Sequence, residues 1–357
     1  MRLLRLGPPL VRTALAVLVA VLASMAAVPR ARCQAARAVV ARSVFVNRNG
    51  GADFTSVQDA VDSVPFGNGQ WIRVHVAAGV YKFTPFPCPA FSYLFRSSSV
   101  CFLFVTMHRA PSEKVIVPQN KSFILLEGEG WQQTSIEWAD HAGGDSTTAA
   151  SPTFAAYSDD FMARDITFKN TYNGDGRIAP AVAALAAGDR SSFYRCGFVS
   201  VQDTLSDLEG RHYYEGCYIE GAMDFIFGNG QSIFQGCEIW TARTPVWPGF
   251  ITAQGRMSEA DSSGFVFKGC TVRGVTPAYL GRAWRRYARV IFFQTDMSGV
   301  VVSQGGTLTM VEEGCTGQGS NRTGRVPWTK DLSGDDLAKF VDLSYVSADG
   351  WLDAQPR

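Results

Sequence analysis

The fold is decided by three consecutive stretches, SSFYRCGFVSVQD (191–203), RHYYEGCYIEGAMD (211–224) and QSIFQGCEIWTA (231–242). Each has aromatic residues, then a cysteine, then an apolar residue two positions later. A fourth unit, SGFVFKGCTV (263–272), follows after a longer gap, and an earlier relative, DFMARDITFKN (160–170), lacks the cysteine. A repeat of roughly twenty residues predicts a solenoid, in which each coil buries its apolar side chains against the next.

The repeat units are short, rich in β-branched and aromatic residues, and separated by Gly and Asp turns. A leucine-rich repeat is the alternative, but its Leu-x-x-Leu-x-Leu pattern is absent. We therefore expect an all-β, right-handed parallel β-helix. Its apolar column should contain Ile166, Phe198, Ile219, Ile239 and Val272. One short helix is expected within SVQDAVDSV (56–64), where apolar residues recur at helical spacing, and it should cap the N-terminal end of the solenoid.

The cysteines of the repeat fall at matching positions. Neighbouring strands lie about 4.8 Å apart, so Cys196, Cys217 and Cys237 on consecutive coils come within the rough range that a disulfide needs. A ladder of buried thiols is the alternative, since free cysteine is commonly buried. We favour a Cys217–Cys237 disulfide, which would contribute about 3 kcal/mol for a loop of that length. Cys315 has no obvious partner.

Two aspartates share an offset within the repeat. Asp203 and Asp224 each lie seven residues after the cysteine of their unit, which places them at equivalent positions on adjacent coils. Two carboxylates held that close cannot both ionise easily, so the pKa of one should rise. A proton donor beside an ionised partner suits acyl chemistry by a nucleophile and a general acid. The alternative is a pair of turn-forming aspartates bonded to the backbone.

The N-terminus predicts export. Arg2, Arg5 and Arg12 precede a short apolar run, which is typical of a secretory signal peptide over residues 1–28. A membrane anchor is the alternative, but the run is short for a span. Secretion would also permit disulfides and glycans. Of two N-x-[ST] sites, Asn321 lies in a polar stretch and is a better glycan candidate than Asn120.

The composition excludes several classes of protein. The formal net charge is +1, so there is no strong basic field for nucleic acid. Removal of the arginine-rich N-terminus leaves a mildly acidic chain, which suits a substrate whose carboxylates are masked as esters. The four histidines are scattered, at His75, His108, His141 and His212, and we predict no metal and no cofactor. A Ser-His-Asp hydrolase is disfavoured because no G-x-S-x-G elbow occurs.

Several segments look like the signature segments of plant pectin methylesterases. They are VQDTL (201–205), GAMDFIFGNG (221–230), GFITAQGR (249–256) and YLGRAW (279–284), with further matches at GVYK (79–82), EKVIVP (113–118), FILLEGEG (123–130), ARDITFKNT (163–171) and GRVPW (324–328). The resemblance implies a β-helix domain over residues 43–357 that hydrolyses methyl esters of homogalacturonan in the plant cell wall. It also implies a monomer of the short type without a pro-region, with pectin as its polysaccharide partner and an inhibitor protein as a further one.

The same resemblance assigns roles to residues. Asp224 corresponds to the nucleophile that attacks the methyl-ester carbonyl. Asp203 corresponds to the acid that protonates departing methanol and then to the base for the hydrolytic water. Gln202 corresponds to a donor to the oxyanion of the transition state. Arg282 would hold the Asp224 carboxylate, with a surface salt bridge as the alternative.

Substrate contacts are also implied by the family. Trp284 resembles the aromatic residue on which a sugar ring stacks, with simple core packing as the alternative. Thr153 matches a family substrate contact. Phe225 and Phe227 are expected on opposite sides of the solenoid wall, and we favour Phe225 for the cleft.

Three departures from the family pattern stand out. Pro180 takes the place of a family Gln that is a second oxyanion donor, and loss of one such donor typically costs roughly 10²–10³ in rate. Residues 83–112 form an atypical insert. It is either a hydrophobic lid or an intron translated by a wrong gene model, and we favour the intron. The stretch after Val302 is short. These features keep a weak or inactive pectin-binding relative as an alternative function. Another β-helix polysaccharide enzyme is a third, but a lyase would need acidic calcium-binding clusters that the sequence lacks.

Overall fold

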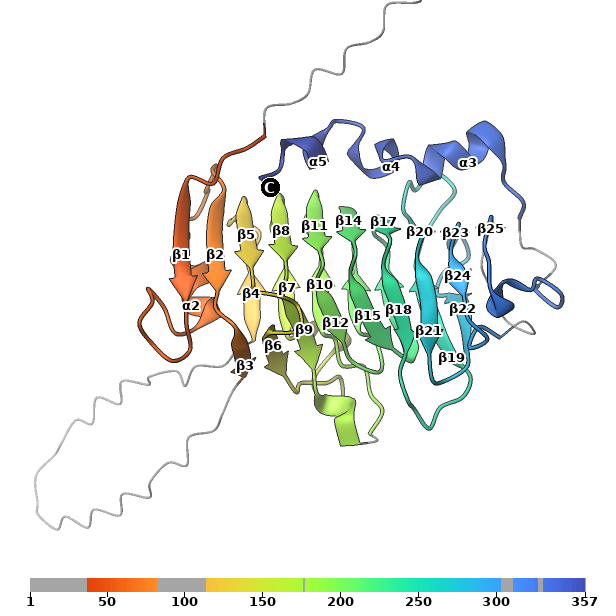
Figure 1. Cartoon of the computed structure of the whole chain (residues 1–357), viewed down its shortest axis with the longest axis horizontal. Helices are drawn as coiled ribbons and strands as arrows, with labels where there is room; N and C mark the ends of the chain where they lie inside the picture. The colour runs from red at the N-terminus through yellow and green to blue at the C-terminus, as the bar shows by residue number, and fades with distance from the viewer. Residues whose placement is uncertain (1–36, 83–113, 176, 303–310, 327–329, 357) are drawn as a thin grey trace, which may run out of the picture. The chain divides into compact units, whose positions relative to one another are not determined.

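The computed structural model describes residues 37–82, 114–175, 177–302, 311–326 and 330–356, and these residues form three parallel sheets that wind into a right-handed β-helix (Figure 1). Each complete coil contributes one strand to each sheet in turn, and the coils at the two ends contribute to fewer sheets. The predicted signal peptide, the insert 83–112 and the segment directly after Val302 lie outside the described residues. The flanks of the insert are described: β3 ends at Lys82 and β4 begins at Val115.

The strands stack in sequence order within each sheet. The ten-stranded sheet contains β1 (Arg42–Val46), β2 (Ile72–Val76), β5 (Ile124–Glu127), β8 (Phe161–Arg164), β11 (Ser191–Tyr194), β14 (Arg211–Glu215), β17 (Gln231–Gln235), β20 (Gly264–Lys268), β23 (Val290–Phe293) and β25 (Val311–Glu313). The eight-stranded sheet contains β3 (Gly79–Lys82), β6 (Thr134–Trp138), β9 (Thr167–Asn170), β12 (Gly197–Val199), β15 (Tyr218–Gly221), β18 (Glu238–Thr241), β21 (Thr271–Gly274) and β24 (Asp296–Met297). The seven-stranded sheet contains β4 (Val115–Val117), β7 (Phe154–Ala156), β10 (Ala184–Ala186), β13 (Leu205–Asp207), β16 (Met223–Gly228), β19 (Gly249–Gln254) and β22 (Ala278–Ala283).

The predicted apolar column is confirmed except at its first member. Phe198, Ile219, Ile239 and Val272 pair in register and are fully buried. Phe168, not Ile166, pairs with Phe198 and begins the column. Ile166 instead occupies the position that a cysteine takes in the following coils. Its carbonyl accepts a hydrogen bond from the Gly197 amide, just as the Cys196 carbonyl accepts one from the Tyr218 amide one coil later.

The predicted Cys217–Cys237 disulfide is wrong. Both residues are free thiols in a buried ladder with Cys196 and Cys270. Side chains stacked in register on parallel strands keep the strand spacing of about 4.8 Å, whereas disulfide-bonded Cβ atoms lie about 3.8 Å apart. The thiols donate instead to backbone carbonyls, with Cys217 Sγ 3.4 Å from the Phe193 oxygen and Cys270 Sγ 3.2 Å from the Phe234 oxygen. Burial raises the pKa of the Cys196 and Cys237 thiols.

The predicted N-terminal helix is confirmed as α2 (Val57–Asp62). Ser56 caps it by accepting a hydrogen bond from the Asp59 amide at 3.3 Å. Val57, Ala60 and Val61 are fully buried and join the main core beside the first coil, which is the position expected of a cap. Single 3₁₀ turns also occur at η1 (Thr148–Ala150), η2 (Tyr172–Asp175) and η3 (Gln318–Ser320).

The C-terminal segment, which the sequence did not predict as helical, contains α3 (Gly334–Val341), α4 (Ser344–Ser347) and α5 (Trp351–Ala354). It runs back across the ten-stranded sheet (Figure 1). Its apolar residues Leu337, Val346, Trp351 and Leu352 pack on outward-facing residues of that sheet, Tyr213, Ile233, Val266, Ile291 and Val311. Helices this short give little periodicity in a sequence, so tertiary packing decides them. No helix among the described residues is long and apolar enough to span a membrane.

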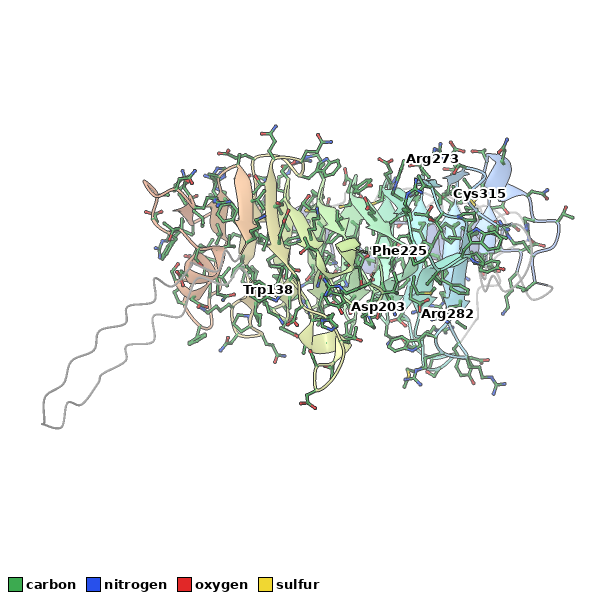
Figure 2. The ribbon with its side chains drawn as sticks, turned by 90° about the horizontal axis from the view of Figure 1, so that it is seen from below. Trp138, Asp203, Phe225, Arg273, Arg282 and Cys315 are labelled. Atoms are coloured by element: carbon green, nitrogen blue, oxygen red, sulfur yellow. The ribbon has the colours of Figure 1, made fainter. Side chains whose placement is uncertain are left out.

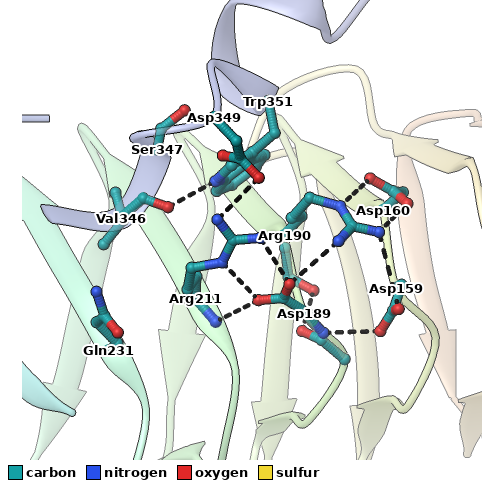
Figure 3. Close-up of polar contacts among 12 residues, drawn as sticks. Asp159, Asp160, Asp189, Arg190, Arg211, Gln231, Val346, Ser347, Asp349 and Trp351 are labelled. Atoms are coloured by element: carbon teal, nitrogen blue, oxygen red, sulfur yellow. Dashed lines mark hydrogen bonds and ion pairs between the residues drawn. The ribbon is translucent and has the colours of Figure 1, made fainter. Parts of the chain in front are cut away.

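Charged pairs tie this segment to the solenoid (Figure 3). Arg190 forms a fork with Asp160, with N–O distances of 2.8 and 2.7 Å, and also contacts Asp189. Arg211 forms a second fork with Asp189 and reaches Asp349 of the C-terminal segment at 3.0 Å. The network spans consecutive coils and fixes where the segment docks.

His212 forms a buried ion pair with Asp207, the last residue of β13. The two nitrogens of His212 face two acceptors, the Asp207 carboxylate and the Gly188 carbonyl, the latter at 2.9 Å. Both nitrogens must therefore donate, which requires the imidazolium form. Burial alone would lower the pKa of His212, but the Asp207 charge and the two hydrogen bonds raise it overall. Tyr214 and Ser232 donate to the same carboxylate, so the pair is satisfied on all sides.

Candidate active site

Asp203 and Asp224 occupy matching positions on adjacent coils. Leu205 of β13 pairs with Ile226 of β16, and each aspartate lies two residues earlier in the chain: Asp203 just before β13 and Asp224 within β16. The Asp203 amide also donates to the Met223 carbonyl at 3.0 Å, which joins the two coils directly beside the pair. Both aspartates have left-handed backbones, with φ of 60° and 48°. Aspartate tolerates this conformation better than most residues do, and six other described non-glycine residues of the chain share it, so it does not by itself mark the site.

Arg282 holds the Asp224 carboxylate from two strands away. It lies on β22, and Arg282 Nε is 2.7 Å from Asp224 Oδ1 while Nη2 bonds Oδ2, so the contact is a bidentate fork. The guanidinium also lies 4.8 Å from the ring centroid of Phe250 on the intervening strand β19. This arrangement fixes the orientation of the carboxylate and pairs it with a permanent positive charge.

Asp203 has a very different environment. Burial raises the pKa of Asp203 to about 7, with a further rise from the Asp224 charge and a partial offset from Arg282. Among the described residues, no hydrogen-bond donor satisfies its carboxyl group. Asp203 therefore carries its proton in mildly acidic solution, next to the Asp224 carboxyl group that the Arg282 fork orients. The two carboxyl groups therefore have different environments, and the raised pKa of Asp203 agrees with the expectation that the pKa of one member of the pair rises.

Gln202 and Pro180 lie on neighbouring coils beside the pair. The Gln202 carbonyl accepts from the Ala181 amide at 3.1 Å, and Gln202 bridges to Met223 on the other side. Its side-chain amide forms no hydrogen bond within the described part of the chain, so it is available to donate to a ligand. Pro180 is half-buried, and its carbonyl accepts from the Ala142 amide at 2.8 Å. Pro180 offers no donor at the position of the family Gln.

Phe225 and Phe227 lie on the opposite sides of the solenoid wall from those predicted. Phe225 is fully buried in the main core, so its prediction as the cleft residue is wrong. Figure 2 labels it together with Asp203 and Arg282. A register shift in β16 between Met223 and Ile226 is the reason, because it turns both Phe225 and Ile226 inward. Phe227 is the residue that faces outward.

Trp284 lies on the outer face beside Phe227. Its side chain is 53% exposed, which excludes simple core packing. The two rings meet edge to face, with centroids 6.3 Å apart. An exposed indole held at its edge is suited to stacking on a sugar ring.

The predicted substrate contact at Thr153 is wrong. Thr153 is fully buried, and its hydroxyl donates to the Lys169 carbonyl at 3.1 Å. Its amide bonds the Val182 carbonyl, so both polar groups join neighbouring coils. Thr153 therefore stabilises the segment directly before β7.

Phe250 is a site residue that sequence reasoning missed. It lies in the segment GFITAQGR, and its ring contacts the Arg282 guanidinium and, at a tilt of 36°, the ring of Tyr279. The motif itself was the available signal, but the contact depends on the pairing of β19 with β22. Among the described residues, no group of three or more His, Cys, Asp or Glu is arranged to hold a metal ion.

Comparison with known proteins gives a consistent result. A model of the pectinesterase family matches residues 96–349. The chain is 40% identical over 333 residues to probable pectinesterase 55 of Arabidopsis thaliana, covering 88% of this chain and 91% of that relative. It is 39% identical to probable pectinesterase 29 of the same plant, covering 89% and 91%. Among solved structures, it resembles pectin methylesterase from carrot with a TM-score of 0.75 and 28% identity, covering 90% of this chain and 99% of that one.

Proposed function

The chain belongs to the pectinesterase family, and on that basis we propose how its residues carry out the family's reaction. The enzyme is a carboxylic-ester hydrolase that converts methyl esters of homogalacturonan to pectate and methanol. Asp224 is the nucleophile of the proposal, Asp203 the general acid and base, and Arg282 the residue that orients the nucleophile. One observation carries these roles: a raised pKa at Asp203 beside an Asp224 held in an arginine fork.

The first half of the reaction forms an acyl-enzyme. An Asp224 carboxylate oxygen attacks the ester carbonyl carbon, and the carbonyl electrons move onto oxygen. Gln202 donates to that oxyanion, which exists only in the transition state and intermediate. The tetrahedral centre then collapses, the bond to the methoxy oxygen breaks, and Asp203 gives its proton to departing methanol. Burial of Asp203 is what keeps that proton available near neutral pH.

The second half reverses the proton movement. Asp203, now ionised, takes a proton from a water molecule that attacks the acyl carbon. The bond between this carbon and the Asp224 oxygen breaks, which restores both aspartates to their starting states and releases a galacturonic acid group, whose proton is then lost to solvent to leave the carboxylate. Trp284, exposed beside Phe227, supports the sugar ring by stacking.

The test is methanol release from highly methylated pectin by the purified enzyme. We expect methanol without cleavage of the polymer, and loss of methanol release in Asp224→Asn with an unchanged circular dichroism spectrum. Polymer cleavage or unsaturated ends would instead indicate a different β-helix enzyme. Retained activity in Asp224→Asn would remove the nucleophile assignment, and absence of methanol from the wild type would refute the proposed reaction.

Export to the plant cell wall is a further part of the proposal. It is supported by the basic and apolar pattern over residues 1–28 and by the cell-wall location of the substrate. Asn120 and Asn321 are both exposed, so both sequons are accessible to glycosylation. The proposal includes a monomeric enzyme and a protein inhibitor as partner. N-terminal sequencing of enzyme secreted from plant cells tests export, and an unprocessed Met1 would refute it.

A further inference from the structure

We propose that Gln254, Gly255 and Arg256 are positioning residues that hold Trp284 as the sugar platform and thereby set substrate affinity. The inference rests on the proposed function, because it concerns how the same site binds its polymer. Two loops leave the seven-stranded sheet at this point. Loop 255–263 follows β19, and loop 284–289 follows β22 and begins with Trp284.

Gln254 joins these loops through its own backbone and side chain. Its carbonyl accepts from the Trp284 amide at 3.2 Å. Its side-chain oxygen accepts from two amides, Arg256 N at 3.0 Å and Arg289 N at 2.9 Å. One fully buried residue therefore fixes the start of loop 255–263 and both ends of loop 284–289.

The side-chain nitrogen of Gln254 is unfavourable for stability in this arrangement. It is buried and has no hydrogen-bond partner among the described residues. The amide cannot be reversed to relieve this, because its nitrogen would then face two N–H donors. A buried, unpaired donor is normally destabilising, so the two hydrogen bonds that the side-chain oxygen accepts must offset that cost.

Gly255 provides the space for the indole. A Cβ at this position would lie 2.9 Å from Cε3 of Trp284, closer than carbon atoms approach. The Gly255 amide donates to the Gly228 carbonyl at 2.7 Å, which keeps the backbone close to β16. The ring therefore rests directly on backbone on one side, contacts Phe227 at its edge, and remains open to solvent elsewhere.

Arg256 locks the two loops together. It is 6% exposed, yet its guanidinium bonds carbonyl oxygens: Asp261 O at 2.7 Å and Glu259 O in its own loop, and Tyr287 O at 3.3 Å in the other. Burial and the nearby Arg289 lower its pKa. Because the buried guanidinium of Arg256 bonds backbone carbonyls, it fixes the geometry of the two loops. It therefore supports the segment that carries Trp284 and does not contact the reacting atoms.

Gly255→Ala is the sharpest test, because Gly255 does not have a positive φ and the closest contact of the new methyl is the Trp284 ring. Binding of a methylated galacturonate hexamer is measured calorimetrically in the Asp224→Asn background, where the ligand is not turned over. We expect Gly255→Ala to raise Kd about fivefold, the loss of one aromatic contact, with little change in melting temperature. Gly299→Ala is the matched control, since its methyl meets only a side chain, Gln318 Oε1 at 2.8 Å, on a later coil.

A double-mutant cycle with Trp284→Ala decides whether Gly255 acts through the indole. The inference requires that Gly255→Ala has no further effect once Trp284 is removed. Equal weakening in both backgrounds, or no weakening at all, would overturn it. If the Asp224→Asn parent binds no hexamer, the proposed function falls together with this inference; if the parent binds and Gly255→Ala matches it, only the inference falls.

Gln254 gives an independent test with a conservative rescue. Gln254→Glu keeps an acceptor for the two amides and removes the orphaned donor, so we expect its Kd to stay near that of the parent. Gln254→Met keeps the length but loses the acceptor, so its Kd should rise about fivefold or more. A glutamate variant as weak as the methionine variant would refute the acceptor role.

Discussion

Replacement of Asp203 by Asn should flatten the pH dependence of folding stability. The folded pKa of Asp203 is about 7, and an aspartate in an unfolded chain titrates near 3.9. Because the folded pKa is the higher one, the folded protein keeps a proton that the unfolded chain releases between about pH 4 and pH 7. Wild-type stability must therefore fall as the pH rises through this window. Asparagine cannot ionise, and it tolerates the left-handed backbone that this position requires.

The magnitude follows from the shift. A difference of about 3 units corresponds to about 4 kcal/mol over the whole window, since each unit is worth about 1.4 kcal/mol. Between pH 5 and pH 8 the same linkage gives about 2.6 kcal/mol. Asp203 is only partly buried, and solvent screening reduces this to about 2 kcal/mol. Wild type should lose that much more unfolding free energy than Asp203→Asn over this interval.

The assay is equilibrium unfolding in urea at pH 5, 6, 7 and 8 for both proteins. Only the difference between the two curves matters, because all other titrating groups are shared. Asp145→Asn, at an exposed aspartate outside the site, controls for loss of a negative charge and should run parallel to wild type. Parallel curves for Asp203→Asn, within about 0.5 kcal/mol, would refute the raised pKa and with it the argument for a proton donor.

Three further predictions follow from the same structure. Pro180→Gln restores a side-chain donor beside the aspartate pair and should raise kcat for methanol release by about 100-fold; an unchanged kcat would show that another group already fills this role. Unfolding in iodoacetamide without reductant should alkylate both Cys217 and Cys237, as mass spectrometry of their peptides can show, and a linked peptide pair would contradict the free thiols. His212→Gln should lower the unfolding free energy by about 3 kcal/mol at pH 5, because it leaves Asp207 buried without its cation. The His212 contribution is fully present below about pH 6.5 and is lost as the pH rises through its raised folded pKa, so the two stability curves should converge at alkaline pH.

Part of the site was predictable because a solenoid converts sequence spacing into spatial position. The equal offsets of Asp203 and Asp224 from their cysteines become equal positions on adjacent coils, as the pairing of β13 with β16 shows. Arg282 could be assigned only through its motif, since it is 58 residues from Asp224 in sequence and two strands away in space. The pKa of Asp203 depends on burial, which the repeat alone does not give.

The sequence by itself determined the coil, the apolar column and the aspartate pair, because each depends on a period that the chain repeats. The tertiary structure decided whatever departs from that period. A register shift in β16 turned Phe225 into the core and left Phe227 outside. The spacing of parallel strands kept Cys217 and Cys237 as thiols. The support beneath Trp284 comes from Gln254 at the end of the neighbouring strand and from Gly255 just after it. There a hydrogen bond and the absence of a side chain create a contact that no local pattern encodes.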